Sequence, residues 1–239
     1  MELCFAADLR LFLAPRHRAG SVRVGCDGTS SLGHVVESLG VPLPEVGRLI
    51  VNDQQEQPSY RPQADDVVQV QAVDRPQPLP TTGFLLDVHL GALARRMRLL
   101  GLDVAYSNDC SDDVLVEMAN AGRRALLTRD RGLLQRRKLW LGAYVRGDRP
   151  DDQLADVLDR FAPALAPWTR CTACNGPLSR VAKSEVEQQL LPGTRRSYQE
   201  FWRCGDCGRV YWPGAHSRRL GAIVARATGS GLITGDQPG

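Results

Sequence analysis

The sequence predicts an α/β protein of three successive units, and three observations support this. Strand and helix patterns alternate from Gly83 to about Ala162, which is typical of a parallel sheet with helices on both faces. From Met1 to Val73 the expected order is strand, strand, helix, strand, strand, a small β-grasp pattern. Two Cys-x-x-Cys pairs follow the middle unit and indicate a metal-binding module. With 239 residues, 43% of them hydrophobic, the chain can build more than one core.

Composition shifts twice along the chain and marks the boundaries between these units. The stretch 74–83 is rich in proline and reads as a linker, and 162–168 contains two prolines immediately before the first cysteine pair. We therefore expect a β-grasp domain at 1–74, a linker at 75–83, a parallel-sheet domain at 84–165, a cysteine module at 166–222 and a flexible tail at 223–239.

The first unit has clear strand and helix signals. The cap residues at 28–31 predict that a helix begins at Leu32. We expect this helix at Leu32–Leu39 and strands at Glu2–Leu9, Ser21–Cys26, Arg48–Val51 and Asp66–Ala72. The order resembles that of the ubiquitin-like sulfur-carrier proteins. Those carriers end on a free Gly-Gly, whereas here the chain continues past Val73, so packing or recognition of a protein partner is favoured over sulfur transfer.

The middle unit should place its ligand crevice beyond the carboxyl ends of its parallel strands. The expected strands are Phe84–Leu86, Asp103–Tyr106, Ala125–Thr128 and Ala143–Arg146. The expected helices are Leu90–Leu100, Asp113–Ala121, Gly132–Arg137 and Asp152–Phe161.

Aspartates follow each of these strands. They are Asp87, Asp109, Asp130 and Asp148, and Asp112 and Asp113 stand at the start of the next helix. Carboxylates that converge at one sheet edge suit Mg²⁺ or Mn²⁺, and two such ions could hold the attacking water and the leaving oxygen of a phosphodiester. The alternative is that individual aspartates cap helices or are simply solvated. Thr128 is either a strand residue or a hydrogen-bonding partner that orients Asp130.

The segment 84–104, the aspartates near 112 and the stretch 126–130 together resemble the Mut-seven C-terminal (Mut7-C) RNase family, some bacterial members of which carry an N-terminal ubiquitin-like domain. The resemblance covers residues 83 to about 216. It implies a PIN-like fold with a metal site at Asp87, Asp112 and Asp130, and with Asp113 as a less certain member. The candidate catalytic residues are Asp87, Asp112, Asp113, Thr128 and Asp130.

Three arginines are candidates for contact with substrate phosphate. Arg95 lies one turn into the helix that follows Asp87, while Arg129 and Arg131 flank Asp130. Each could instead form a structural ion pair.

The cysteine module has the spacing of a structural zinc site. Cys171, Cys174, Cys204 and Cys207 would provide four thiolates and close the coordination shell of a zinc ribbon, while redox chemistry is the alternative for such pairs. Aromatic and basic residues surround the second pair and could either stack on unpaired bases or pack the ribbon. They are Tyr198, Phe201, Trp202, Arg203, Arg209, Tyr211, Trp212 and His216.

These features lead to one principal functional hypothesis, a metal-dependent ribonuclease with catalytic Mg²⁺ or Mn²⁺, structural zinc and RNA as its partner. The alternative is a non-catalytic RNA-binding adaptor with the same fold. The formal net charge of +3 does not decide between them. Asp8 and Arg10 interrupt the first apolar run, and no stretch is long enough to cross a bilayer, so we expect a cytoplasmic protein without membrane contact.

Overall fold

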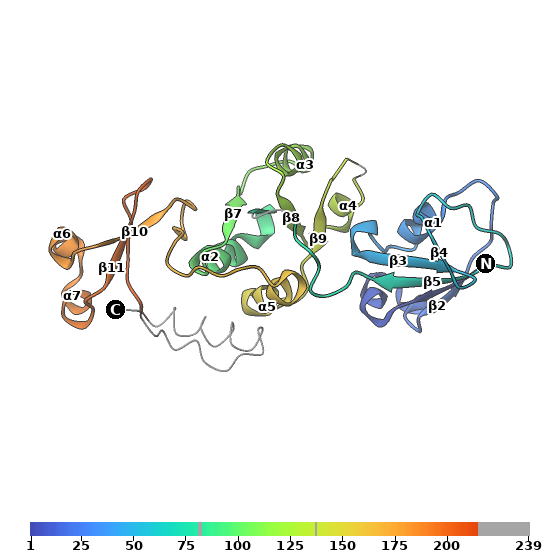
Figure 1. The fold of residues 1–239 in the computed structure, drawn as a ribbon, viewed down its shortest axis with the longest axis horizontal. Coiled ribbons are helices and arrows are strands. Elements are labelled where there is room, and N and C mark those ends of the chain that lie inside the picture. Colours follow the sequence, from blue (N-terminus) through green and yellow to red (C-terminus); the bar gives the residue numbers. More distant parts are fainter. Residues whose placement is uncertain (81–82, 137, 215–239) are drawn as a thin grey trace.

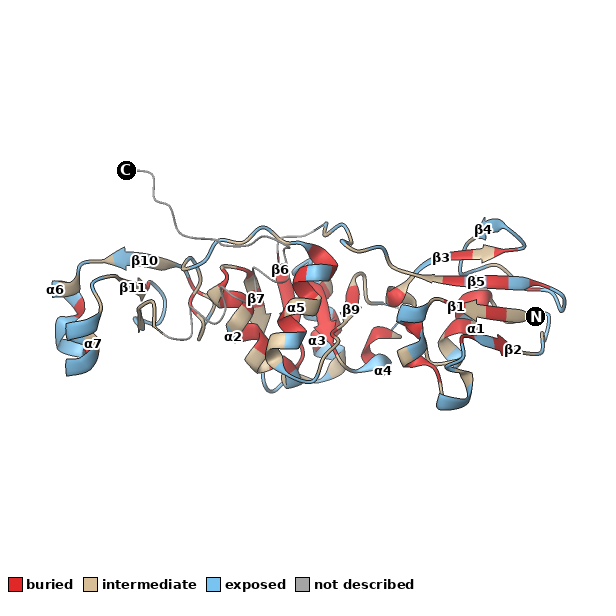
Figure 2. Ribbon diagram, turned by 90° about the horizontal axis from the view of Figure 1, so that it is seen from below, coloured by how far each residue is buried: buried red, intermediate tan, exposed pale blue. Residues whose placement is uncertain are grey.

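The fold was described from a computed structural model, in which residues 1–80, 83–136 and 138–214 can be placed. Three units follow one another along the long axis of the molecule (Figure 1). The N-terminal sheet, the central parallel sheet and the C-terminal ribbon each contain buried residues of their own (Figure 2). The predicted tail at 223–239 and His216 lie outside the described residues. Within the described part of the chain, no helix is long and apolar enough to cross a membrane.

The N-terminal unit is a mixed five-stranded sheet in the order β2-β1-β5-β3-β4. Its parallel pair, β1 with β5, lies at the centre, and the other neighbouring strands are antiparallel. Ser31 caps α1 by accepting a hydrogen bond from the N–H of His34, as the cap signal predicts. The elements are β1 (Glu2–Phe5), β2 (Ser21–Arg23), α1 (Leu32–Ser38), β3 (Val46–Val51), β4 (Gln54–Glu56) and β5 (Val67–Ala72).

The predicted first strand is too long. It ends at Phe5, and a 3-10 helix, η1 (Ala7–Phe12), occupies the rest of the expected range. Leu9 and Phe12 are three residues apart, so this helix can bury both of them in the same core. The short strand β4 was not predicted, because the polar Gln54–Glu56 has no apolar alternation.

The central unit is a four-stranded, wholly parallel sheet in the order β7-β6-β8-β9. The central strands β6 (Gly83–Leu86) and β8 (Ala125–Thr128) are buried at every position, as expected for strands covered on both faces. The outer strands are β7 (Asp103–Tyr106) and β9 (Gly142–Tyr144), the latter two residues shorter at its carboxyl end than predicted.

Helices cover both faces of the central sheet. On one face α2 (Gly91–Leu99) and α5 (Pro150–Phe161) pack against a core that includes Phe84, Leu86 and Leu127. On the other face α3 (Asp112–Ala121) and α4 (Arg131–Leu134) cover Leu85 and Leu126. A 3-10 turn, η4 (Val88–Leu90), precedes α2 and includes Leu90, the first residue of the predicted helix, and α4 is shorter than predicted.

The C-terminal unit is a three-stranded antiparallel ribbon of the zinc-ribbon kind. Its strands are β10 (Leu178–Val181), β11 (Phe201–Cys204) and β12 (Val210–Tyr211). Between β10 and β11 lie the short helices α6 (Lys183–Val186) and α7 (Pro192–Ser197). Val186, Leu190 and Phe201 form a small core under these elements.

A fully buried ion pair joins the N-terminal and central units. Nη1 of Arg160, on α5, lies 2.6 Å from Oε1 of Glu45, and both side chains are almost completely inaccessible. The same Glu45 oxygen accepts a hydrogen bond from the backbone N–H of Tyr144, at the end of β9. Arg160 also donates to Oε1 of Gln77 and to the carbonyl of Pro44. The ubiquitin-like unit is therefore fixed to the edge of the parallel sheet by buried polar contacts.

Candidate active site and cysteine module

Asp87 lies directly after the central strand β6, at the carboxyl edge of the parallel sheet, and is only 3% exposed. Its Oδ1 accepts a hydrogen bond from the N–H of His89, which makes it the cap of η4. Its Oδ2 accepts hydrogen bonds from the hydroxyl of Thr128 and the backbone N–H of Arg129. Among the described residues, no basic side chain forms an ion pair with it. Asp87 is thus a buried carboxylate with no cationic partner in the described part of the chain.

Thr128, the last residue of β8, connects two of the predicted site aspartates. Its hydroxyl donates to Asp87 and accepts a hydrogen bond of 2.8 Å from the backbone N–H of Asp130. The side chain is completely buried. Of the two roles considered for Thr128, the structure supports a hydrogen-bonding one, although its side chain holds Asp87 and the Asp130 backbone rather than the Asp130 carboxylate.

Asp130 is the N-cap of α4. Its Oδ1 accepts hydrogen bonds from the N–H groups of Gly132 and Leu133, at 2.7 and 3.4 Å. Its Oδ2 has no hydrogen-bond partner among the described residues, and the side chain is exposed. Capping of α4 therefore occupies Oδ1 of Asp130, while Oδ2 could still bind a ligand.

Asp112 and Asp113 begin α3 and face a basic side chain. Nη2 of Arg136 lies 3.8 Å from Oδ2 of Asp112, and Nη1 lies 3.4 Å from Oδ1 of Asp113. Both carboxylates are exposed to solvent, Asp113 more than Asp112. In the part of the chain that the structure describes, the aspartates do not form a group whose oxygens all lie within 4.8 Å of one another.

The two remaining strand-end aspartates lie at the surface. Asp148 pairs with Arg129 at 2.9 Å, and Asp109 is exposed. Arg129 also donates to the carbonyl of Gly147. Arg131 donates to the carbonyls of Leu11 and Phe12 in the ubiquitin-like unit, so its guanidinium helps to hold that unit in place. Arg95, by contrast, is exposed and makes no hydrogen bond or ion pair with any described residue.

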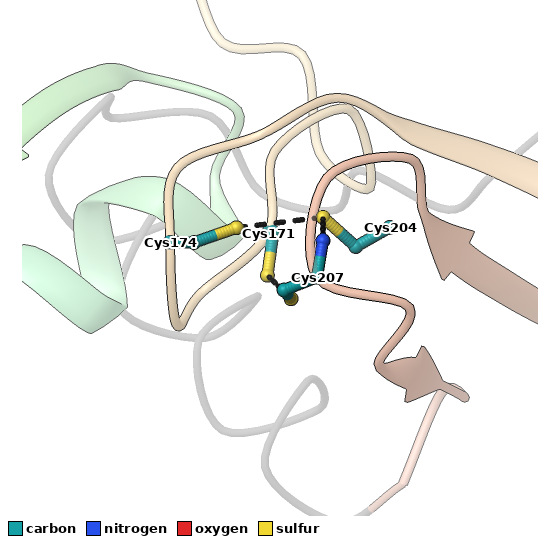
Figure 3. Close-up of side chains that lie close together, drawn as sticks. All are labelled: Cys171, Cys174, Cys204 and Cys207. Carbon is teal, nitrogen blue, oxygen red and sulfur yellow. Dashed lines mark hydrogen bonds between the residues drawn. The ribbon is translucent and has the colours of Figure 1, made fainter.

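The four cysteines of the C-terminal unit do converge. All four Sγ atoms lie within 4.8 Å of one another, with 3.6 Å between Cys171 and Cys207 and 3.5 Å between Cys174 and Cys204 (Figure 3). Four sulfurs at about 2.3 Å from a tetrahedral zinc would be about 3.8 Å apart, so the donor set fits the ion. The cluster could hold a structural metal such as zinc.

The environment of this cluster favours a thiolate at one of its buried positions. Burial raises the pKa of the Cys171 thiol, but hydrogen bonds from the Tyr211 hydroxyl and from backbone amides of the first knuckle outweigh it and lower the pKa to about 6. Burial and the neighbouring thiols raise the pKa of Cys174 to about 12. Clustered thiols do not all ionise together without a cation, which is the charge that zinc would supply.

Comparison with known families agrees with this arrangement. The Mut7-C RNAse domain matches residues 82–224, more than half of the chain, and the Mut7-C ubiquitin domain matches residues 1–78. The chain belongs to the Mut7-C RNAse family. No curated protein and no solved structure matches it. The resemblance identified from the sequence is therefore confirmed, with both domains in the expected order, and the family is of the ribonuclease type.

Within this Mut7-C fold, the contacts between the sheet and the first knuckle were not predicted. Arg98 on α2 is buried and donates to the carbonyls of Thr172 and Ala173. Asn175 donates to Asp103 at 2.7 Å and accepts from the N–H of Val104. In the sequence, Arg98 resembles any helix-surface arginine, and its burial could not have been recognised without the position of the knuckle.

Most of the aromatic residues around the second knuckle pack against other parts of the ribbon. Trp168 and Trp202 stack with their ring centroids 4.7 Å apart, and Tyr198 and Trp212 pack against the small core. Phe201 is completely buried. Of the two alternatives for this group, packing accounts for these described side chains.

Proposed function

We propose that this chain is a metal-dependent ribonuclease that hydrolyses RNA phosphodiester bonds at the carboxyl edge of its parallel sheet. Asp87, Asp112 and Asp130 would hold Mg²⁺ or Mn²⁺, and Asp113 would add charge at the same edge. The family match supports the ribonuclease class. The metal dependence and the residue roles are our proposal.

The observation that carries this proposal is that Asp87 is buried and forms no ion pair with any residue that the structure describes. A helix cap needs only an oxygen acceptor, which serine, threonine or asparagine supplies without charge. A buried, unpaired carboxylate is costly, and buried charges are normally paired or bound to a metal. Asp87 is only 3% exposed and lies at the strand edge where such sheets bind ligands.

The neighbouring residues are suited to support an ion at Asp87. Thr128 fixes the orientation of the carboxylate, and the unpartnered Oδ2 of Asp130 is available as a second ligand. Among the placed residues, the Asp112 carboxylate has one long contact, 3.8 Å to Arg136, and a divalent ion could replace it. Magnesium commonly retains several waters, so the protein oxygens need not lie as close together as four zinc thiolates.

A bound divalent ion would supply Lewis acidity and activate a water for attack on the phosphodiester. Asp87 and Asp130 would orient that ion, and Arg95, whose guanidinium has no partner among the residues that the structure describes, would bind substrate phosphate. Zinc at the four cysteines would be structural, because four thiolates leave no open position for water.

One observation favours the adaptor alternative. Asp87 and Asp130 both cap helices and Asp112 and Asp113 share one arginine, so each aspartate has a structural partner. The two functions can be separated by titrating Mn²⁺ into the wild-type chain and an Asp87→Asn variant while following thermal unfolding. A nuclease site predicts that Mn²⁺ raises the melting temperature of the wild type and not that of the variant.

The same variant provides an internal control on folding. Asparagine keeps the size and one acceptor oxygen, but its amide nitrogen cannot accept the hydrogen bond that reaches the other Asp87 oxygen, so without divalent ions Asp87→Asn should lose no more than about 1–3 kcal/mol of stability. Equal Mn²⁺ stabilisation of both proteins would reject a site at Asp87. A large loss of stability in the variant without Mn²⁺ would indicate a purely structural carboxylate.

A further inference from the structure

A cleft of about 380 Å³ lies between helix α2 and the two cysteine knuckles. One wall comes from the parallel-sheet domain and includes Arg95, Arg98 and Tyr106, and the other comes from the ribbon and includes Cys174, Cys207 and Arg209. Its volume is in the range of small-ligand pockets. No role in the proposed chemistry has been given to this cleft as a whole.

One residue that lines the cleft contacts the segment directly after Asp87. Tyr106, the last residue of β7, donates a hydrogen bond of 3.0 Å to the carbonyl of Val88, the residue after Asp87. Gly91, which also lines the cleft, packs so closely that a Cβ there would lie 2.6 Å from the Tyr106 hydroxyl oxygen. Tyr106 therefore connects the lining of the cleft to the strand end that carries Asp87.

The basic residues of the cleft are of two kinds. Arg98 is held at the first knuckle by its hydrogen bonds to the carbonyls of Thr172 and Ala173. Arg95 and Arg209 are exposed, and neither side chain has a hydrogen-bond or ion-pair partner among the described residues. Two guanidinium groups without a partner in the described structure thus line one cleft from its two walls.

We propose that this cleft binds the phosphate backbone of a single-stranded RNA segment adjoining the bond to be cleaved. The inference rests on the ribonuclease function proposed above and extends the substrate site from the sheet edge to the ribbon. Arginine is well suited to phosphate because its fork of donors matches the phosphate oxygens. A basic groove that follows the backbone is the usual means of holding single strands without reading their sequence. The ribbon then serves as the second wall of the substrate site.

The test measures RNA binding separately from cleavage. Binding of a fluorescently labelled single-stranded RNA to the zinc-loaded full chain is measured without free divalent ions, so that cleavage does not contribute. The variants are Arg95→Gln, Arg209→Gln and the double substitution. The matched control is Arg196→Gln, which removes the same charge from an exposed arginine on α7 that also lacks a partner in the described structure. Zinc content confirms that each variant retains its ribbon.

The double variant should weaken binding at least tenfold, and the slope of log affinity against log salt should become shallower by about 1.4, for two lost phosphate contacts to a single strand. Arg196→Gln should bind within about twofold of wild type. If the double variant binds like Arg196→Gln, the cleft is not the RNA path, even where Mn²⁺-dependent cleavage is intact. If cleavage is absent but the double variant still loses affinity, the cleft assignment stands and the nuclease proposal fails. A wild-type chain that binds no RNA overturns both.

Discussion

The hydroxyl of Thr128, at the end of β8, donates a hydrogen bond to Oδ2 of Asp87, at the end of the neighbouring strand β6. The same hydroxyl oxygen accepts a bond from the backbone N–H of Asp130. Two aspartates separated by 43 positions in the sequence, 130 − 87, are therefore linked through one buried threonine. This link makes Thr128 the residue through which the geometry of the proposed metal site can be tested.

Replacing Thr128 with valine keeps the shape and removes the hydroxyl. Asp87 would lose a buried donor, so the free energy of unfolding should fall by about 1–3 kcal/mol and Mn²⁺ should bind more weakly. Thr128→Ser, which keeps the hydroxyl, should recover the Mn²⁺ affinity. Denaturant unfolding measures the loss of stability, and calorimetry measures the Mn²⁺ affinity. A valine variant with wild-type Mn²⁺ affinity would show that the threonine does not position the site.

The buried pair between Glu45 and Arg160 should fix the ubiquitin-like domain to the parallel sheet. Arg160→Met leaves Glu45 buried without its cation and should destabilise the protein by about 3–5 kcal/mol. The double substitution with Glu45→Leu should be much less harmful, because neither charge then remains buried. Thermal unfolding of Arg160→Met, Glu45→Leu and the double variant gives this comparison. Equal loss in the single and double variants would contradict the coupling.

The full chain should bind about one zinc ion, and Cys174→Ser should abolish this binding. Because Arg98 and Asn175 connect the first knuckle to α2 and β7, loss of zinc should also lower the melting temperature of the parallel-sheet domain. Cys110→Ser provides the control, since Cys110 lies outside the cluster. Elemental analysis of reduced protein together with a thermal scan provides the test. Full zinc content in Cys174→Ser would reject the four-cysteine site.

Asp103 should make stability depend on acid pH. Burial raises the pKa of Asp103, but hydrogen bonds from Arg124 and Asn175 outweigh it and hold the pKa below the ordinary 3.8. The contribution is fully present above that ordinary value and is lost as the pH falls through the folded-state pKa. Asp103→Asn should therefore be less stable at neutral pH, by about 1 kcal/mol after allowing for its partial exposure, and the difference should close in strong acid. Denaturant unfolding of both proteins from neutral pH to strong acid measures this difference in stability.

Asp109→Asn is the control for this acid effect. Asp109 is exposed, and no described residue bonds to its side chain. Its replacement should leave the pH profile of stability unchanged. An Asp103→Asn variant that tracks the wild type at every pH would show that the contact with Arg124 and Asn175 contributes nothing to the folded state.

Patterns that are local in the chain allowed much of this architecture to be predicted. Ser31 precedes an apolar helix pattern and does cap α1, and the buried strand before Asp87 ends where the apolar run ends. The two Cys-x-x-Cys pairs specify their ligands by spacing alone. The fold class and the cysteine cluster follow from such signals because few other structures satisfy them.

Interactions between distant parts of the chain could not be predicted in the same way. Glu45 and Arg160 are 115 positions apart, and neither has a local feature that marks it as buried. The sequence likewise identifies Asp87 as a strand-end carboxylate without indicating that it lacks a cation. Arg131 was a plausible phosphate ligand, yet its donors reach carbonyls of the ubiquitin-like domain, whose position only the tertiary structure reveals.

The most direct test of the proposed function compares RNA cleavage by the wild-type chain and Asp130→Asn with and without Mn²⁺. Asparagine can still cap α4, so the melting temperature should change little, while the charge available to a divalent ion is lost. We expect Mn²⁺-dependent cleavage by the wild type and at least a tenfold lower rate in the variant, equivalent to about 1.4 kcal/mol of barrier. Cleavage that is absent in the wild type, or is equal in both proteins, would contradict the proposal that these aspartates form a nuclease site.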